Sequence, residues 1–212
     1  MKTSIALKTL LGAGALTLPL LAFAESNVQT GAATASPGAT AHVDFAIVIP
    51  KILYLRVGSG SAYASGTLTS ANSIDLITFS PAAGTVGNGT AVAGTGGDLT
   101  GGVETAAIVS NSGNVTLNAT ASGALSDGYG DTIPFTQITT AATTLTSGTQ
   151  LPAPVLTNGT SSNVVLTAPA SKLIVEDAKW TYSYANAANV PAGTYGGANL
   201  NNGRVTYTAT MP

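Results

Sequence analysis

The sequence contains no cysteine and only one histidine, His42. Without cysteine the chain has no disulfide, no thiol nucleophile and no thiolate ligand for a metal ion. One histidine also cannot supply the several nitrogen ligands of a usual zinc site. His42 is on the polar side of an alternating stretch, two residues before Asp44, so we interpret it as a solvent-facing strand residue and not as a catalytic base.

Charged residues are scarce as well, at 8% of the chain, and the formal net charge is −2. The sequence has no basic stripe of the kind that binds a phosphate backbone, which excludes nucleic acid as an expected partner. Stability must come from burial and backbone pairing. A chain of 212 residues is long enough to bury roughly 70% of its unfolded surface in one domain.

Long apolar runs are missing except at the N-terminus. Lys2 and Lys8 precede an apolar run over residues 10–24 that ends in Ala-Phe-Ala. This order is typical of a secretory signal peptide cleaved after Ala24, and the run is shorter than the roughly 20 residues of a membrane-spanning helix. We therefore expect residues 1–24 to be a signal peptide. The mature chain, without a membrane span, is expected in the periplasm, at the cell surface or secreted.

What the sequence has in abundance is apolar residues at every second position, which is typical of strands with one buried face. In residues 39–49, apolar Ala39, Ala41, Val43, Phe45, Ile47 and Ile49 alternate with Thr40, His42 and Asp44. Further strands are expected over residues 52–57, 73–80, 105–110, 114–121, 163–167, 172–175, 179–185 and 204–211. The threonine-rich residues 136–150 are expected to be loop or strand.

Turn signals separate these segments, among them the Asn-Gly dipeptides that begin at Asn88, Asn158 and Asn202. No segment beyond the leader combines a helical apolar stripe with helix caps. Many short, half-buried strands without helices indicate two stacked sheets. We predict an all-β protein with a flexible N-terminal extension over residues 25–38 and one β-sandwich domain over residues 39–212.

Candidate catalytic or metal-binding residues are few. Asp127 and Asp131 flank a Gly-Tyr-Gly sequence and offer oxygen ligands suited to calcium, but an ordinary exposed turn is the interpretation we favour. Glu176 and Asp177 form the one adjacent acidic pair, which fits a solvated strand end. A hydrolase that used carboxylates alone would need two of them about 5–9 Å apart in a cleft, and no feature favours this. We expect no catalytic residue, no metal and no other cofactor, and therefore no enzyme.

The aromatic residues Trp180, Tyr182 and Tyr184 share one face of a strand by their spacing. On the inner face of a sandwich they would anchor the core, and this is the interpretation we favour. On an outer face they would form a platform for sugar rings. A carbohydrate-binding or adhesive module is therefore the alternative function.

Three stretches of the chain resemble a known group of proteins. They are ATAHVDFAIVIPKILYLRVG after a small-residue leader, GNVTLNATASG in the middle, and VPAGTYGG followed by GRVTYTATMP at the end. They resemble the secreted pilin-like sandwiches of Gram-negative bacteria, the chaperone–usher fimbrial subunits and the spore-coat-U-like group. The resemblance implies an immunoglobulin-like fold in which a neighbour's N-terminal extension supplies a strand. The missing disulfide and the long glycine-rich segment 84–102 depart from that pattern.

The resemblance and the composition together predict a non-catalytic structural protein, such as a fimbrium-like or surface-assembly subunit with a role in adhesion. Its expected partners are other copies of itself or a periplasmic chaperone. The candidate assembly residues are Val43, Phe45, Ile47 and Ile49, which would enter the groove of another copy. The same strand could instead complete its own sheet.

Overall fold

A computed structural model describes residues 26–34, 38–63, 73–146 and 148–212 of the chain. The chain divides into two units, residues 1–49 and residues 50–212. The expected signal peptide lies outside the described residues. Within the described ranges, no helix has both the length and the apolar character that crossing a membrane requires.

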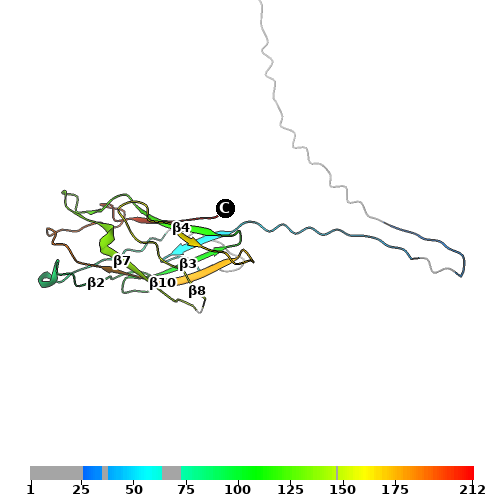
Figure 1. Cartoon of the computed structure of the whole chain (residues 1–212), viewed down its shortest axis with the longest axis horizontal. Coiled ribbons are helices and arrows are strands. Elements are labelled where there is room, and N and C mark those ends of the chain that lie inside the picture. The colour runs from blue at the N-terminus through cyan, green and yellow to red at the C-terminus, as the bar shows by residue number, and fades with distance from the viewer. Residues whose placement is uncertain (1–25, 35–37, 64–72, 147) are drawn as a thin grey trace, which may run out of the picture. The chain divides into compact units, whose positions relative to one another are not determined.

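In the first unit, residues 38–49 form no β-strand (Figure 1). Each of them is exposed, and the large apolar side chains of Val43, Phe45, Ile47 and Ile49 are 73%, 90%, 87% and 75% exposed. The strand predicted over residues 39–49 is therefore wrong for this structure. Alternation gives a segment an apolar face, but a strand also needs a neighbour that accepts its backbone hydrogen bonds.

The second unit, residues 50–212, is built almost entirely from strands. One sheet holds six of them: β1 (Leu53–Val57), β2 (Val92–Ala93), β3 (Val103–Ser110), β7 (Ile138–Thr143), β8 (Thr149–Gln150) and β10 (Ile174–Tyr184). A second sheet has the order β11 (Val205–Thr210), β4 (Val115–Ala121), β9 (Val164–Leu166). A hairpin of β5 (Leu125–Ser126) and β6 (Thr132–Ile133) and two 3₁₀ turns, η1 (Ala83–Thr85) and η2 (Phe135–Gln137), complete it. The all-β prediction is confirmed, and the architecture is consistent with a β-sandwich.

Strand β10 organises the larger sheet because it pairs with four other strands. It runs antiparallel to β3 from the pair Ile174–Ser110 to the pair Thr181–Val103. It also pairs antiparallel with β7 and β2, and parallel with β8. The sequence predicted two strands over residues 172–175 and 179–185. They are one strand, since the acidic pair between them interrupts the apolar pattern but not the backbone ladder.

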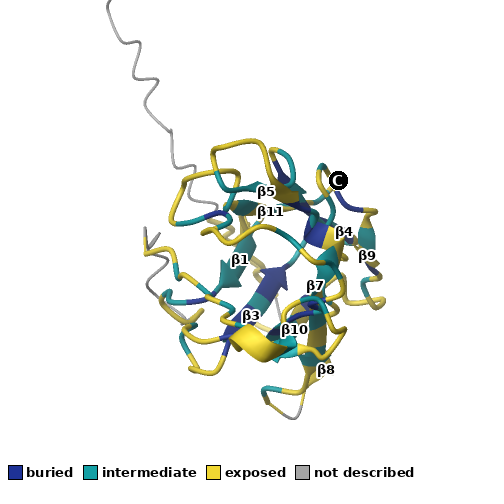
Figure 2. Cartoon of the chain, turned by 90° about the vertical axis from the view of Figure 1, so that its left-hand side faces the viewer, coloured by how far each residue is buried: buried dark blue, intermediate teal, exposed yellow. Residues whose placement is uncertain are grey.

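The two sheets share one core (Figure 2). On β4 the residues alternate as predicted: Val115, Leu117, Ala119 and Ala121 are buried, and the polar residues between them are not. These side chains belong to the same core cluster as Ile108 of β3 and Trp180 of β10. Trp180 has no exposed surface, and its indole N–H donates to the carbonyl oxygen of Leu151 at 3.0 Å.

Residues 73–79, which we call the strap, do not form the strand predicted over residues 73–80. Among the described residues, their one ladder contact is an isolated bridge between Thr78 and Thr95. Ile74 and Leu76 are 68% and 52% exposed, while Ile77 and Phe79 pack against the core. The strap is thus an irregular segment attached to the edge of the domain, and it borders the cavity described next.

Candidate functional site

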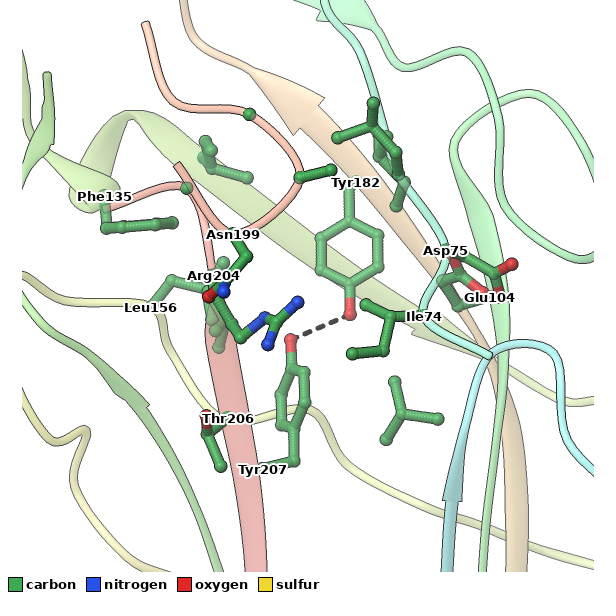
Figure 3. Close-up of a pocket in the computed structure, with 18 of the residues that line it drawn as sticks. Ile74, Asp75, Glu104, Phe135, Leu156, Tyr182, Asn199, Arg204, Thr206 and Tyr207 are labelled. Carbon is green, nitrogen blue, oxygen red and sulfur yellow. Dashed lines mark hydrogen bonds between the residues drawn. The ribbon is translucent and has the colours of Figure 1, made fainter. Parts of the chain in front are cut away.

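A cavity of about 540 Å³ lies between the two sheets (Figure 3). Its walls come from the strap, from the ends of β1, β3 and β7, from β10 and from β11. Most of the lining is apolar. The polar groups that reach it include the Tyr182 and Tyr207 hydroxyls, the Asp75 and Glu104 carboxyls and Arg204. A mostly apolar cavity with a few polar groups is the usual form of a binding site.

Two tyrosines join the sheets across this cavity. The hydroxyls of Tyr182 on β10 and Tyr207 on β11 are 2.8 Å apart and form a hydrogen bond (Figure 3). The Tyr207 ring also packs against Trp180, with ring centroids 5.3 Å apart. Burial raises the pKa of Tyr207 to about 12. Burial, followed by the neighbouring Tyr207, also raises the pKa of Tyr182. Both phenols therefore keep their protons at neutral pH.

A pair of carboxyl groups lies at one side of the cavity. Glu104 stands on the core-facing row of β3, in line with Ala106 and Ile108, and is only 4% exposed. Its side chain forms a hydrogen bond with that of Asp75 from the strap. Two carboxyl groups in contact must share a proton, because both cannot carry charge there without strong repulsion.

The surroundings place that proton on Glu104. Burial, and then the charges of Asp75 and Asp98, raise the pKa of Glu104 to about 8, although an N–H from Asp98 opposes them. Burial would also raise the pKa of Asp75, but hydrogen bonds from the Ser59 backbone and side chain outweigh it and lower that pKa. The Ser59 hydroxyl donates to Asp75 at 2.7 Å. Glu104 is therefore the donor and Asp75 the acceptor.

The cationic side chain of Arg56, close to this pair, already has partners of its own. The guanidinium of Arg56 forms an ion pair with Asp98 at 3.0 Å, and its Nε donates to the carbonyl oxygen of Gly58 at 2.8 Å. Gly58 adopts a positive φ of 81°, and a Cβ atom there would lie 2.6 Å from a Glu104 carboxyl oxygen. The turn after β1 can approach the carboxyl pair this closely because residue 58 is glycine.

This arrangement fastens one segment to another. The Asp75 oxygens accept hydrogen bonds from Ser59 and Glu104, and one Glu104 oxygen accepts the Asp98 N–H at 3.3 Å. Little of the hydrogen-bonding capacity of either carboxyl group is left for a bound molecule. The carboxyl pair therefore attaches the strap to the end of β3, and the apolar walls and the two tyrosines remain available to an occupant of the cavity.

The open side of the domain lies next to the cavity. Strand β1 ends the larger sheet and β11 ends the smaller one, and these two strands contact each other (Figure 2). The core-facing residues of β11 are only partly buried, whereas those of its neighbour β4 are fully buried. The inner face of β11 is thus incompletely covered.

The residues predicted as sites are placed as follows. Val43, Phe45, Ile47 and Ile49 are exposed and belong to no strand of the described chain. Trp180, Tyr182 and Tyr184 are buried, at 0%, 6% and 7% exposure. Trp180 therefore offers no surface to a sugar ring, and of the three only Tyr182 lines the cavity.

The acidic candidates lie elsewhere. Asp127 and Asp131 are in an exposed turn, where Asp127 accepts N–H groups from Tyr129 and Asp131 at 2.8 and 3.1 Å. In the part of the chain that the structure describes, no three acidic or histidine side chains gather as metal ligands would. Asp177 accepts hydrogen bonds from Thr146.

Apart from Tyr182, the residues that line the cavity were not among the candidates from the sequence. Glu104 was overlooked because β3 is buried on both faces, so that no alternation marks its inner row. The available signal was a charged residue two positions before Ala106 in an otherwise apolar and small-residue strand.

Comparisons of the chain with protein-family models, with curated proteins and with solved structures find no match.

Proposed function

We propose that this chain is a non-catalytic structural protein of the periplasm or cell surface that assembles with copies of itself. In this proposal residues 39–49 of one copy add as a strand beside β11 of the next, and residues 50–212 are an immunoglobulin-like, pilin-type sandwich. The observation that carries it is an exposed, alternating apolar segment in the same chain as an uncharged, incompletely covered edge strand.

The donor segment has the right pattern for strand addition. Val43, Phe45, Ile47 and Ile49 share one face by their two-residue spacing and are at least 73% exposed. Burying four such side chains stabilises a complex by roughly 6–12 kcal/mol before the costs of association. Isolated apolar side chains on a surface are common, but a continuous row of this kind is typical of an interaction site.

Of the edge strands β1, β7 and β11, strand β11 has the fewest features that would prevent an added strand from pairing with it. Charged residues and prolines usually prevent edge strands from pairing with another chain. Strand β11, with the sequence VTYTAT, contains neither. Strand β1 carries Arg56 at its edge. Strand β7 is also uncharged, but its Ala142 carbonyl already accepts the Gln150 amide at 3.0 Å. Strand β11 is therefore the favoured acceptor.

The test compares two substitutions in the donor segment. Phe45 and Val48 are almost equally exposed, at 90% and 91%, but lie on opposite sides of the alternation. Phe45→Asp places a charge on the buried face of the proposed added strand and should abolish association. Val48→Asp places the same charge on the other face and should leave association intact. Analytical ultracentrifugation and negative-stain imaging of the exported protein measure both.

Three outcomes would contradict the proposal. Equal effects of the two substitutions would show that general hydrophobicity drives association. Strict monomers of the unaltered chain, with or without a periplasmic chaperone, would remove assembly altogether. A large loss of monomer stability in Phe45→Asp would show that the segment completes its own sheet.

A synthetic peptide of residues 38–49 should slow hydrogen exchange of β11 amides, and the peptide with Asp at position 45 should not.

A further inference from the structure

We propose that the hydrogen-bonded carboxyl pair of Glu104 and Asp75 is a proton-controlled latch. While the two groups share a proton, the strap stays fastened beside the cavity; when the strap opens, that proton passes to water and the cavity is uncovered. Rising pH therefore favours the open strap. The latch stands on its own geometry, and only its consequence for assembly rests on the proposed function.

The strap has few other attachments to the domain. Beyond Asp75, the polar contacts that hold it are the paired backbone hydrogen bonds between Thr78 and Thr95, at 2.9 and 2.8 Å, and the Thr95 hydroxyl bonded to the Thr78 carbonyl. Ile74 and Leu76 on either side of Asp75 are more than half exposed. Ile77 and Phe79 pack against the core, so the part of the strap that opens locally at a small cost in free energy is the part around Asp75. There one lost contact can decide the position of the chain.

The charges around the pair do not compensate a second negative charge. The turn before β3 brings Asp98 and the end of β1 brings Arg56, and these two already neutralise each other. From β10 and β11 the hydroxyls of Tyr182 and Tyr207 line the same cavity, and both stay neutral because burial raises the pKa of each. Arg204 lines the cavity from the start of β11, but it is exposed to water.

The direction of the pH effect follows from the two states of Glu104. In the closed state its pKa is raised from 4.5 to about 8, whereas in an opened, hydrated site it returns toward the ordinary value. Between these values the closed state binds the additional proton. Each unit of increase in pH therefore raises the ratio of open to closed strap by up to about tenfold, until Glu104 ionises in the closed state as well. The gain ends above about pH 8.

The strap lies where an added strand would have to enter. It contributes residues from Ser73 to Phe79 to the wall of the cavity, and Val205 and Tyr207 of β11 contribute the opposite wall. Opening the strap therefore widens the approach to the inner face of β11. If assembly uses that edge, a higher pH accelerates it.

Hydrogen exchange of the full chain between about pH 5 and about pH 8, corrected for intrinsic rates, tests the latch. Protection of the strap amides should fall by up to about tenfold per pH unit. Glu104→Gln keeps a donor toward Asp75 without an ionisable proton, so its strap should stay protected at all these values. Asp75→Asn removes the second charge but leaves Glu104 buried, so it should make the profile shallower without abolishing it. Glu176→Gln alters a half-buried carboxyl on β10 and should leave it unchanged.

The outcomes separate the latch from the proposed assembly. The same pH dependence in Glu104→Gln, or none in the unaltered chain, overturns the latch whatever the chain assembles into. If the strap opens as expected but the association rate does not rise with it, the latch does not control assembly. If the chain never associates, the proposed function fails, and the exchange profile still decides whether the latch exists.

Discussion

Residues 39–49 and strand β4 have nearly the same pattern of apolar residues but differ in burial. Each alternates apolar and polar side chains along most of its length. On β4 the apolar set is buried, with Leu117 at 0% exposure, between the partner strands β11 and β9. In residues 39–49 the apolar set is exposed and the backbone forms no ladder. Alternation therefore specifies a face, whereas the neighbouring strands decide whether that face is buried.

The largest expected difference between the two segments is in stability. Leu117→Ala should lower the free energy of unfolding by about 2–5 kcal/mol, because it leaves a cavity between the sheets. Phe45→Ala should change it by less than about 0.5 kcal/mol, because the ring is exposed in the single chain. Urea unfolding at a concentration where the chain is monomeric measures both. Similar losses would mean that residues 39–49 already pack as β4 does.

A smaller effect is expected at the polar contact between the sheets. Tyr207→Phe removes one hydroxyl of the 2.8 Å Tyr182–Tyr207 hydrogen bond and should cost about 1 kcal/mol. Tyr129→Phe is the matched control, since Tyr129 is 95% exposed, and it should have almost no effect. Thermal unfolding of the two variants tests whether the Tyr182–Tyr207 hydrogen bond contributes to the stability of the domain. Equal midpoints for the two variants would show that it does not.

The smallest change in stability is expected from the largest alteration, a deletion of the whole segment 25–49. Deleting residues 25–49 should move the thermal midpoint by less than about 2 °C, because the large apolar side chains of that segment contribute no burial. Size-exclusion chromatography of the same variant should show that association is lost. A drop of ten degrees or more would instead place residues 39–49 in their own domain, and the comparison with β4 would no longer hold.

Much of the fold could be predicted because burial on one face leaves a visible pattern. The strands at 115–121 and 205–210 were found within a residue of their ends for this reason. Residues 73–80 carry a strand-like composition, yet only Thr78 forms a bridge. Strand composition describes side chains that fit a sheet, and it does not supply a partner strand.

The cavity could not be predicted in the same way. Its walls join Val57, the strap, Glu104 and Tyr207, which are far apart in the sequence and meet only because β10 holds the sheet together. The hydrogen bond between Glu104 and Asp75 depends on that meeting. A sequence reveals periodicity within one segment, whereas a contact between distant segments requires the topology.

The pairing of β10 also has a consequence for how the chain folds as it is made. Strands β2, β7 and β8 precede it and have their ladder partners in residues 176–184. Until ribosomal synthesis reaches those residues, the antiparallel β1–β3 pair is the part of the larger sheet that can form among the described strands. Non-local pairing of this kind slows folding and leaves unpaired edges open to aggregation. The interval before residues 176–184 are synthesised is therefore the one in which this polypeptide most needs protection by a holding factor.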